Sequence, residues 1–258
     1  MKYYITSDPH GFYSILRDAL KTAGFFDEKG EHKLVILGDL FDRGEEAPEM
    51  QDFILKLMDE ERVILIKGNH EDLFHTLLTS DHGLPYDYNV QNGTYSTALQ
   101  LTGYDIDRAV HNRAEFVEAA KQTPYYQRII PSMLDYYETE HFIFVHGWIP
   151  CLYHRHTGYS YYSEWRKLDI FEWKKARWYN GIDAAFTCME DKTILCGHWH
   201  ASYGHWKYEH KGSEFEEDAD YTPYYGPGVI ALDACTAWSN KINVIVLEDN
   251  PLSESRIR

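Results

Sequence analysis

The sequence is poor in cysteine and contains no long apolar run. Its four cysteines, Cys151, Cys188, Cys196 and Cys235, are far apart and form no CxxC pair. This spacing argues against a zinc knuckle or a disulfide framework and favours a reduced, cytoplasmic setting. No stretch approaches the roughly 18 apolar residues of a membrane span, and the first residues, MKYYITSDPH, soon reach charged side chains. We therefore expect a soluble protein that is not exported.

Basic residues are also scarce relative to acidic ones. The 258 residues include 25 lysines and arginines against 41 aspartates and glutamates, which gives a formal net charge of -16 and a pI near 5.2. Such a chain is expected to bind neither nucleic acid nor a membrane surface. A phosphorylated ligand would have to meet cations that are gathered locally. Hydrophobic residues make up 44% of the chain, which is enough for the core of one domain over 1–258.

Short apolar runs alternate with segments of helical periodicity along the first part of the chain. The pattern predicts strands in KYYITSD, KLVILGD and RVILIKGN, and helices in FYSILRDALKTAGF, APEMQDFILKLMDEE and HEDLFHTLLTS. This alternation is typical of an α/β protein with a largely parallel sheet, and in such proteins the site lies at the carboxyl ends of the strands.

The pattern changes over residues 82–135, where an aromatic, polar stretch precedes the predicted helix NRAEFVEAAKQT. We interpret this region as a helical and aromatic insertion or cap. Strands are predicted again in HFIFVHG and KTILCGH. The segment VIALDACTAWSNKINVIVLED reads as two late strands joined by a turn at Ser239, Asn240 and Lys241. The acidic stretch 214–220 is interpreted as a solvated loop.

Oxygen and imidazole donors follow five of the predicted strands. They are Asp8 and His10, Asp39 and Asp42 with Arg43, Asn69 and His70, His146, and His198 and His200. Each motif alone has a plain alternative, such as a turn or a buried core histidine, but that alternative would have to hold at all five strand ends. Mixed oxygen and nitrogen donors suit Mn, Fe or Zn better than Ca or Mg. Asp39 has two carboxylate oxygens and could bridge two cations.

The motifs SDPHG, GDLFDRG, GNHE, VHG and GHWH, in this order, resemble those of the calcineurin-like metallophosphoesterases. The residues of GDLFDRG and GNHE most closely resemble the motifs of the phosphoprotein phosphatase branch. This branch includes bacterial and phage serine/threonine phosphatases and symmetrical diadenosine tetraphosphatases. The resemblance covers most of the chain and is specific for the superfamily, but much less so for the substrate. It implies a four-layer αββα sandwich in which two mixed β-sheets are flanked by helices.

The resemblance also implies two divalent metal ions, Mn first and Fe or Zn as alternatives. One ion would be held by Asp8, His10 and Asp39, and the other by Asp39, Asn69, His146 and His198. The role of His200 stays open, because many metallophosphoesterases use the second histidine of GHxH whereas the phosphoprotein phosphatase branch usually lacks it.

Three further roles follow from the resemblance. His70 would be a general acid oriented by Asp42, and Arg43 would clamp phosphoryl oxygens. We choose Arg177 over Arg166 as the second phosphate-binding arginine, and this choice depends only on the neighbouring residues in WKKARWYNG. Asn92, as a phosphate-binding residue, and Thr97 are expected near the pocket because NVQNGTYST resembles the element that follows GNHE in bacterial members. Lys67 departs from the family, where an arginine often precedes GNHE.

The expected reaction is phosphomonoester hydrolysis by in-line attack of a hydroxide that bridges the two metals, with a phosphorylated protein, or a small phosphorylated metabolite or nucleotide, as substrate. A serine/threonine phosphatase activity ranks first. A symmetrical dinucleoside tetraphosphate hydrolase or another nucleotide pyrophosphatase ranks second. A non-catalytic metal-binding scaffold is the alternative of another class, and the presence of His70, Asp42 and Arg43 argues against it.

Overall fold

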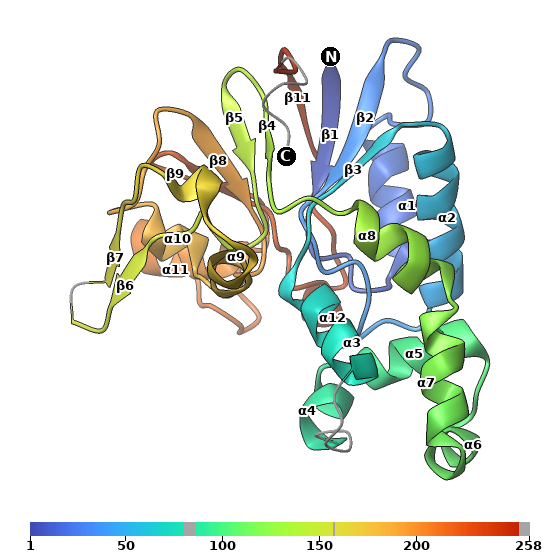
Figure 1. Ribbon diagram of the computed structural model, residues 1–258. Coiled ribbons are helices and arrows are strands. Elements are labelled where there is room, and N and C mark those ends of the chain that lie inside the picture. Colours follow the sequence, from blue (N-terminus) through green and yellow to red (C-terminus); the bar gives the residue numbers. More distant parts are fainter. Residues whose placement is uncertain (80–85, 157, 253–258) are drawn as a thin grey trace.

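The computed structural model describes residues 1–79, 86–156 and 158–252, and it contains two mixed β-sheets (Figure 1). The first sheet has the order β11-β1-β2-β3, and the second has the order β4-β5-β8-β10-β9. A separate two-stranded sheet pairs β6 (Leu152–His154) with β7 (Gly158–Ser160). The mixed character of both large sheets agrees with the sequence-based expectation.

The first sheet is built from parallel strands joined by helical crossovers. Its strands are β1 (Lys2–Thr6), β2 (His32–Ile36), β3 (Val63–Leu65) and β11 (Ile245–Glu248), and only β11 runs antiparallel to its neighbour. Helix α1 (Tyr13–Thr22) connects β1 to β2, and α2 (Ala47–Asp59) connects β2 to β3. Because β1, β2 and β3 are parallel, the segments that follow them leave from one edge of the sheet.

The second sheet has a parallel centre with an antiparallel strand at each edge. Its strands are β4 (Tyr137–Glu138), β5 (Phe142–Phe144), β8 (Thr193–Cys196), β9 (Tyr224–Gly226) and β10 (Val229–Ala231). The carboxyl ends of β5 and β8 lie side by side, since Phe144 is the register partner of Leu195. The chain leaves them into the segments that carry His146 and His198.

Three apolar clusters fill the spaces between four layers. One lies between the sheets and includes Ile5, Val35, Phe144, Leu195 and Ile230. A second joins the first sheet to α1, α2 and helices from the middle of the chain. The third joins the second sheet to α9 (Ile170–Ala176), α10 (Gly181–Ala184) and α11 (Ala201–Glu209). The four-layer αββα arrangement predicted from the motif resemblance is therefore confirmed.

The middle of the chain is helical. It contains α3 (Asn69–Thr79), α4 (Tyr86–Gln91), α5 (Thr94–Thr102), α6 (Ile106–His111), α7 (Arg113–Lys121), the π-helix η1 (Tyr125–Ile129) and α8 (Ile130–Ser132). Helix α7 coincides with the predicted segment NRAEFVEAAKQT. Helix α5 packs on α2 and α3, and α4 to α7 lie beyond the carboxyl ends of β1, β2 and β3 (Figure 1). Residues 82–85 of the predicted insertion lie outside the described part.

Both predicted late strands exist, and the segment that joins them contains the turn at Ser239 to Lys241. They lie in different sheets, because β10 belongs to the second sheet and β11 to the first. A short helix, α12 (Thr236–Ser239), precedes this turn, and Asn240 has a positive φ of 55°. The segment therefore crosses from one sheet to the other. A short 3-10 helix, η2 (Trp165–Lys167), precedes α9.

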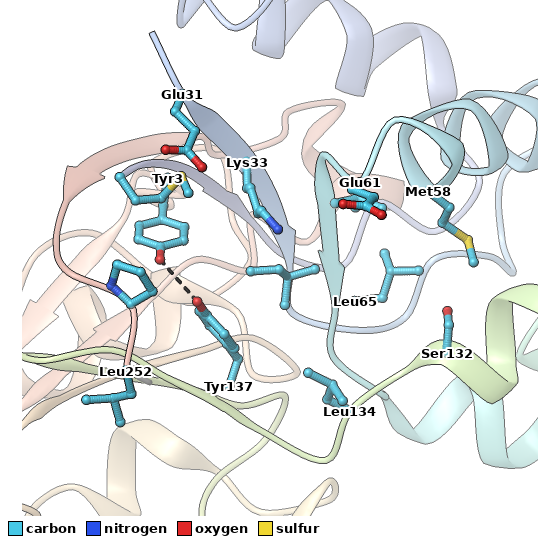
Figure 2. Close-up of a pocket in the computed structure, with 14 residues that line it drawn as sticks. Tyr3, Glu31, Lys33, Met58, Glu61, Leu65, Ser132, Leu134, Tyr137 and Leu252 are labelled. Atoms are coloured by element: carbon cyan, nitrogen blue, oxygen red, sulfur yellow. Dashed lines mark hydrogen bonds between the residues drawn. The ribbon is translucent and has the colours of Figure 1, made fainter. Parts of the chain in front are cut away.

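A cavity of about 720 Å³ lies at the amino ends of the first-sheet strands, away from the predicted site residues. Tyr3, Lys33 and Val63 line it, and the hydroxyls of Tyr3 and Tyr137 are 3.1 Å apart at its wall (Figure 2). No predicted catalytic or metal-binding residue lines this cavity. Within the described ranges, no helix is long and apolar enough to cross a membrane.

Candidate metal centre

Six of the predicted site residues have a left-handed backbone conformation. Positive φ angles occur at Asp8 (51°), His10 (47°), Asp39 (53°), Asp42 (75°), Arg43 (71°) and His198 (63°). For residues other than glycine this conformation costs roughly 1–2 kcal/mol each. Such strain persists only where the surrounding structure enforces it, and it is concentrated at functional sites. Here it turns the side chains that follow three strands towards one another.

Gly38, directly before Asp39, lets three of these loops meet. Its φ is +91°, and a Cβ at this position would lie 2.6 Å from His146 Nδ1 and 2.7 Å from Gly68 Cα. A side chain here would push apart the segments that follow β2, β3 and β5. The glycine of the GDLFDRG motif is therefore required for the close approach of Asp39, Asn69 and His146.

Asp39 lies between two groups of histidines. Its Oδ2 is 3.9 Å from His10 Nε2 and 3.8 Å from His70 Nε2, and its Oδ1 is 3.4 Å from His146 Nε2. The possible donor atoms of Asp39, His146 and His198 lie within 4.8 Å of one another, as do those of His10, Asp39 and His70. Each oxygen of one carboxylate thus faces a different imidazole cluster.

The protonation of His10 and His146 suits metal binding. His10 Nδ1 donates to the Phe41 carbonyl at 2.9 Å, and His146 Nδ1 donates to the Leu37 carbonyl at 2.6 Å. This leaves both Nε2 atoms as lone-pair donors on the Asp39 side. Burial lowers the pKa of His10 and of His146, and burial lowers the pKa of His198 to about 3. Neutral imidazole is the form that binds a cation.

His70 is held in the opposite way. Its Nδ1 donates to Asp42 Oδ2 at 2.7 Å. Burial alone would lower the pKa of His70, but the carboxylates of Asp39 and Asp42 outweigh it and raise the pKa. Two hydroxyls from α5 hold Asp42 in turn, because Thr94 Oγ1 donates to its Oδ2 and Thr97 Oγ1 to its Oδ1, each at 2.7 Å. A protonated imidazole can donate a proton but cannot bind a metal.

Asp8 and Asn69 each contact one histidine of the group formed by Asp39, His146 and His198. The backbone N–H of His198 donates to Asp8 Oδ2 at 3.0 Å, and Asn69 Oδ1 is 2.8 Å from His146 Nε2. Burial and the nearby Asp233 carboxylate raise the pKa of Asp8. Asp8, Asp39 and Asp233 are all buried. Three buried carboxylates so close together are expected where cations neutralise them, so the donor set fits divalent metal ions.

His200, Arg43 and Asn92 lie outside the two donor groups around Asp39. His200 Nε2 is 2.7 Å from Glu214 Oε1 and belongs to neither donor group around Asp39. Arg43 is exposed. Asn92 directly precedes Gly93, where a Cβ would meet the backbone of Arg43, so the segment predicted to lie near the pocket does adjoin Arg43. The acidic stretch 214–220 is not wholly solvated, since Glu214 contacts His200.

Arg177 is engaged by carboxylates from the helical region. Its side chain is only 2% exposed, its Nη1 donates to Asp72 Oδ2 at 2.5 Å, and its Nη2 donates to Asp135 Oδ1. Arg166, the rejected alternative, donates to Glu138 at 2.9 and 3.0 Å and also to Glu190. In this conformation Arg177 ties α9 to α3, so a phosphate would have to displace Asp72 or Asp135 to reach its terminal nitrogens.

Two buried acids escaped the sequence-based selection. Glu71 accepts hydrogen bonds from the backbone N–H groups of Asp39, Leu40 and Gly68, and burial raises its pKa to about 7. It fixes the loop that carries Asp39. Asp233 follows β10, and burial raises the pKa of its carboxyl group. The signal for Asp233 was available, because it follows the apolar run VIAL in the same way as Asp39 follows β2.

A pair of oxygen and nitrogen donor groups that share one carboxylate, next to a histidine–aspartate pair and an arginine, defines the class of metal-dependent phosphoesterases. A family model for calcineurin-like phosphoesterases matches residues 1–231. The chain therefore belongs to this family, whose members are phosphoric ester hydrolases.

Comparison with curated proteins finds bis(5'-nucleosyl)-tetraphosphatase PrpE (asymmetrical) of Bacillus velezensis, which is 28% identical over 133 residues. This match covers 49% of the chain and 51% of the relative. The chain spans about half the length of the curated relatives it matches.

Two solved structures share the fold. A cold-active protein tyrosine phosphatase of a psychrophilic Shewanella sp. has a TM-score of 0.54 at 19% identity, and the alignment covers 96% of this chain and 76% of that one. A protein serine/threonine phosphatase of Saccharomyces cerevisiae has a TM-score of 0.51 at 13% identity, covering 98% and 82%. At these identities the likeness concerns the fold alone.

Proposed function

We propose that the protein is a phosphomonoesterase that works with two divalent metal ions. The observation that carries this proposal is the position of Asp39, whose two oxygens face separate imidazole groups at 3.4 to 3.9 Å. His10 and Asp8 would hold one ion, and Asn69, His146 and His198 the other, with Asp39 shared. His200, bonded to Glu214, would bind a cation only after leaving that partner.

When bound, the two ions would lower the pKa of a water molecule, supply a nucleophile and neutralise the phosphoryl oxygens. The chain's own residues would do the rest. Arg43, exposed at the mouth of the site, would bind phosphoryl oxygens through its planar guanidinium. His70, kept protonated by Asp42 and Asp39, would give its proton to the departing oxygen. Manganese remains our first choice of metal, with Fe or Zn as alternatives.

For the substrate, a phosphorylated protein ranks first on the wording of the GDLFDRG and GNHE motifs. A dinucleoside tetraphosphate is the second candidate, because the curated relatives are named for that activity; their names specify asymmetrical cleavage, whereas the motifs suggested symmetrical cleavage. A metal-binding scaffold is the third. The His70–Asp42–Thr94–Thr97 network speaks against a scaffold, since an oriented acid has no use in a protein that does not catalyse.

The proposal predicts that a chelator abolishes phosphate release and that Mn²⁺ restores it. Metal analysis of the purified protein should find close to two ions per chain. A substrate panel of phosphopeptides, dinucleoside polyphosphates and phosphodiesters, followed by phosphate and nucleotide release, would rank the substrates. Hydrolysis that survives complete metal removal would contradict the metal-dependent mechanism. Metal binding without turnover of any panel member would favour the scaffold.

A second prediction concerns Gly93, which has a φ of +82° and adjoins Arg43. In Gly93→Ala the new Cβ would collide with the backbone nitrogen of Arg43, so we expect kcat/KM to fall by about tenfold or more as the guanidinium moves. Gly103→Ala is the matched control, because Gly103 also has a positive φ of +67° but no atom within 4 Å of the added Cβ. Each alanine should lower stability by about 1 kcal/mol from backbone strain. Equal activity losses in both variants would contradict the role given to the Gly93–Arg43 contact.

A further inference from the structure

Trp178 lies half-exposed against the metal centre. It occupies the turn that follows α9, where its backbone N–H donates to the Lys175 carbonyl at 3.0 Å. Its indole ring is 5.7 Å from the imidazole of His198, centroid to centroid, with an edge-on angle of 84°. The side chain remains 44% exposed. A tryptophan in direct contact with a proposed metal ligand thus presents much of its surface to solvent.

Other aromatic rings form a chain of ring contacts that begins at His198. Trp199 is 6.1 Å from His198 and stacks on His200 at 6.1 Å with an angle of 21°. Phe215 lies 4.5 Å from His200 and is 45% exposed. We call Trp178, Trp199, His200 and Phe215 the aromatic wall. All four come from segments of the second-sheet half, whereas Arg43, Asp42 and His70 come from loops of the first-sheet half.

Exposure of Trp178 alone is ordinary, since Trp206 and Trp238 are also exposed; what sets Trp178 apart is its contact with His198. Aromatic rings gain most when they are buried against other apolar surfaces, so an exposed ring beside a proposed metal ligand offers apolar contact area to a bound substrate. The net charge of -16 adds a second constraint. Because the whole chain repels a polyanion, a ligand with a single phosphoryl group and an apolar body suits this site better than one with a long phosphate chain.

We propose that the aromatic wall selects aryl phosphomonoesters, in which an aromatic ring is joined to phosphorus through a single oxygen, as in a phosphotyrosine side chain. This inference rests on the proposed phosphomonoesterase function and specifies that the preferred leaving group is a phenol. Trp178 contacts His198, a proposed metal ligand, so its ring lies one side chain away from the proposed metal site. A ring one oxygen away from phosphorus would reach Trp178, while a nucleobase, separated by a ribose, would stand further out.

The reaction balances without another reactant. The oxygen of water forms a bond to phosphorus as the bond between phosphorus and the phenolic oxygen breaks. The phenolate takes the proton of His70, and a proton from the attacking water restores His70 at the end of the cycle. The products are a phenol and inorganic phosphate. The wall acts on binding and orientation of the ring, and no proton passes through it.

The test compares Trp178→Leu with wild type on phosphotyrosine and phosphoserine peptides of one sequence, in the full chain loaded with Mn²⁺. We expect kcat/KM for phosphotyrosine to fall about 2- to 10-fold, mainly through KM, and kcat/KM for phosphoserine to change less than about 2-fold. Each substrate is compared with itself, so the better leaving ability of a phenol cancels. Trp178→Phe, which keeps a ring, should retain most of the phosphotyrosine activity.

Trp206→Leu is the matched control. Trp206 is also 44% exposed, but it lies on α11 and its ring neighbour is Tyr203, so we expect no change in the phosphotyrosine to phosphoserine ratio. A binding measurement separates recognition from chemistry. Phenylphosphonate should inhibit the wild type more strongly than methylphosphonate, and Trp178→Leu should remove that difference while the metal content stays unchanged.

The outcomes distinguish this inference from the proposed function. Equal losses for both peptides in Trp178→Leu, or equal inhibition of wild type by both phosphonates, would overturn the aryl preference and leave the phosphomonoesterase intact. A selective loss towards nucleoside monophosphates would also overturn it and assign the wall to a base. Failure of the Mn-loaded wild type to release phosphate from either peptide would overturn the proposed function, and the inference with it.

Discussion

Asp39→Asn is expected to lower kcat/KM by about 10³-fold or more and to reduce the bound metal in the purified protein. The amide keeps the shape of the side chain but loses its negative charge and one oxygen donor. Because Asp39 faces both imidazole groups, this single substitution should weaken the binding of both proposed metal ions. A loss of about 4 kcal/mol of transition-state stabilisation corresponds to a factor of about 10³. Metal analysis and steady-state kinetics on the same preparation would measure both effects.

Asp18→Asn provides the control for this substitution. Asp18 is exposed on α1 and pairs with Arg17 at 3.0 Å, so its loss should leave metal content and turnover unchanged. Far-ultraviolet circular dichroism would show that both variants keep their secondary structure. If Asp39→Asn retained two ions per chain and near-normal turnover, the shared carboxylate would not be the centre of the site.

His70→Asn is expected to lower kcat by about 10²-fold or more while the metal content stays the same. Asparagine cannot deliver a proton to the leaving oxygen. The loss should be smaller for esters of acidic phenols than for alkyl esters, because a good leaving group departs without protonation. A series of aryl phosphates of graded acidity, assayed in wild type and variant, would reveal this as a steeper dependence on leaving-group pKa in the variant.

His75→Asn is the matched control on the same helix, since His75 is exposed on α3 and stacks on Tyr126. Its turnover should equal that of the wild type. His70 Nε2 also lies 3.8 Å from Asp39 Oδ2, which leaves a role as metal ligand to be tested. Loss of one metal equivalent in His70→Asn would assign His70 to the cation and remove it from the acid role.

The alternation of apolar runs with helical segments predicted that the residues following the strands would lie close together. Parallel strands end at the same edge of a sheet, so the residues after β1, β2 and β3 had to be neighbours. The same rule applied to His146 and His198 after β5 and β8. It should also have selected Asp233 after β10, but only the two late strands and the turn between them were considered there, and the acid was passed over.

Other features depend on contacts between residues far apart in sequence. Arg177 meets Asp72 across 105 residues and Asp135 across 42, so the local sequence around Arg177 carries no sign of these partners. The His200–Glu214 contact likewise joins a motif to a stretch that reads as a simple acidic loop. The left-handed backbone at Asp8 and Asp39 is imposed by the meeting of loops, since neither residue favours that conformation by itself.

The hydroxyls of Thr94 and Thr97 donate hydrogen bonds to Asp42 from α5, a helix in the middle of the chain that lies outside both sheets. Helix α5 thus supports the proposed general acid, and removing the helices that follow α3 to obtain a minimal two-sheet version would leave Asp42, the partner of His70, without these two hydrogen bonds. Sequence changes on the buried side of α5 offer evolution a way to adjust the strength of that acid while every residue in the loops after the strands stays the same.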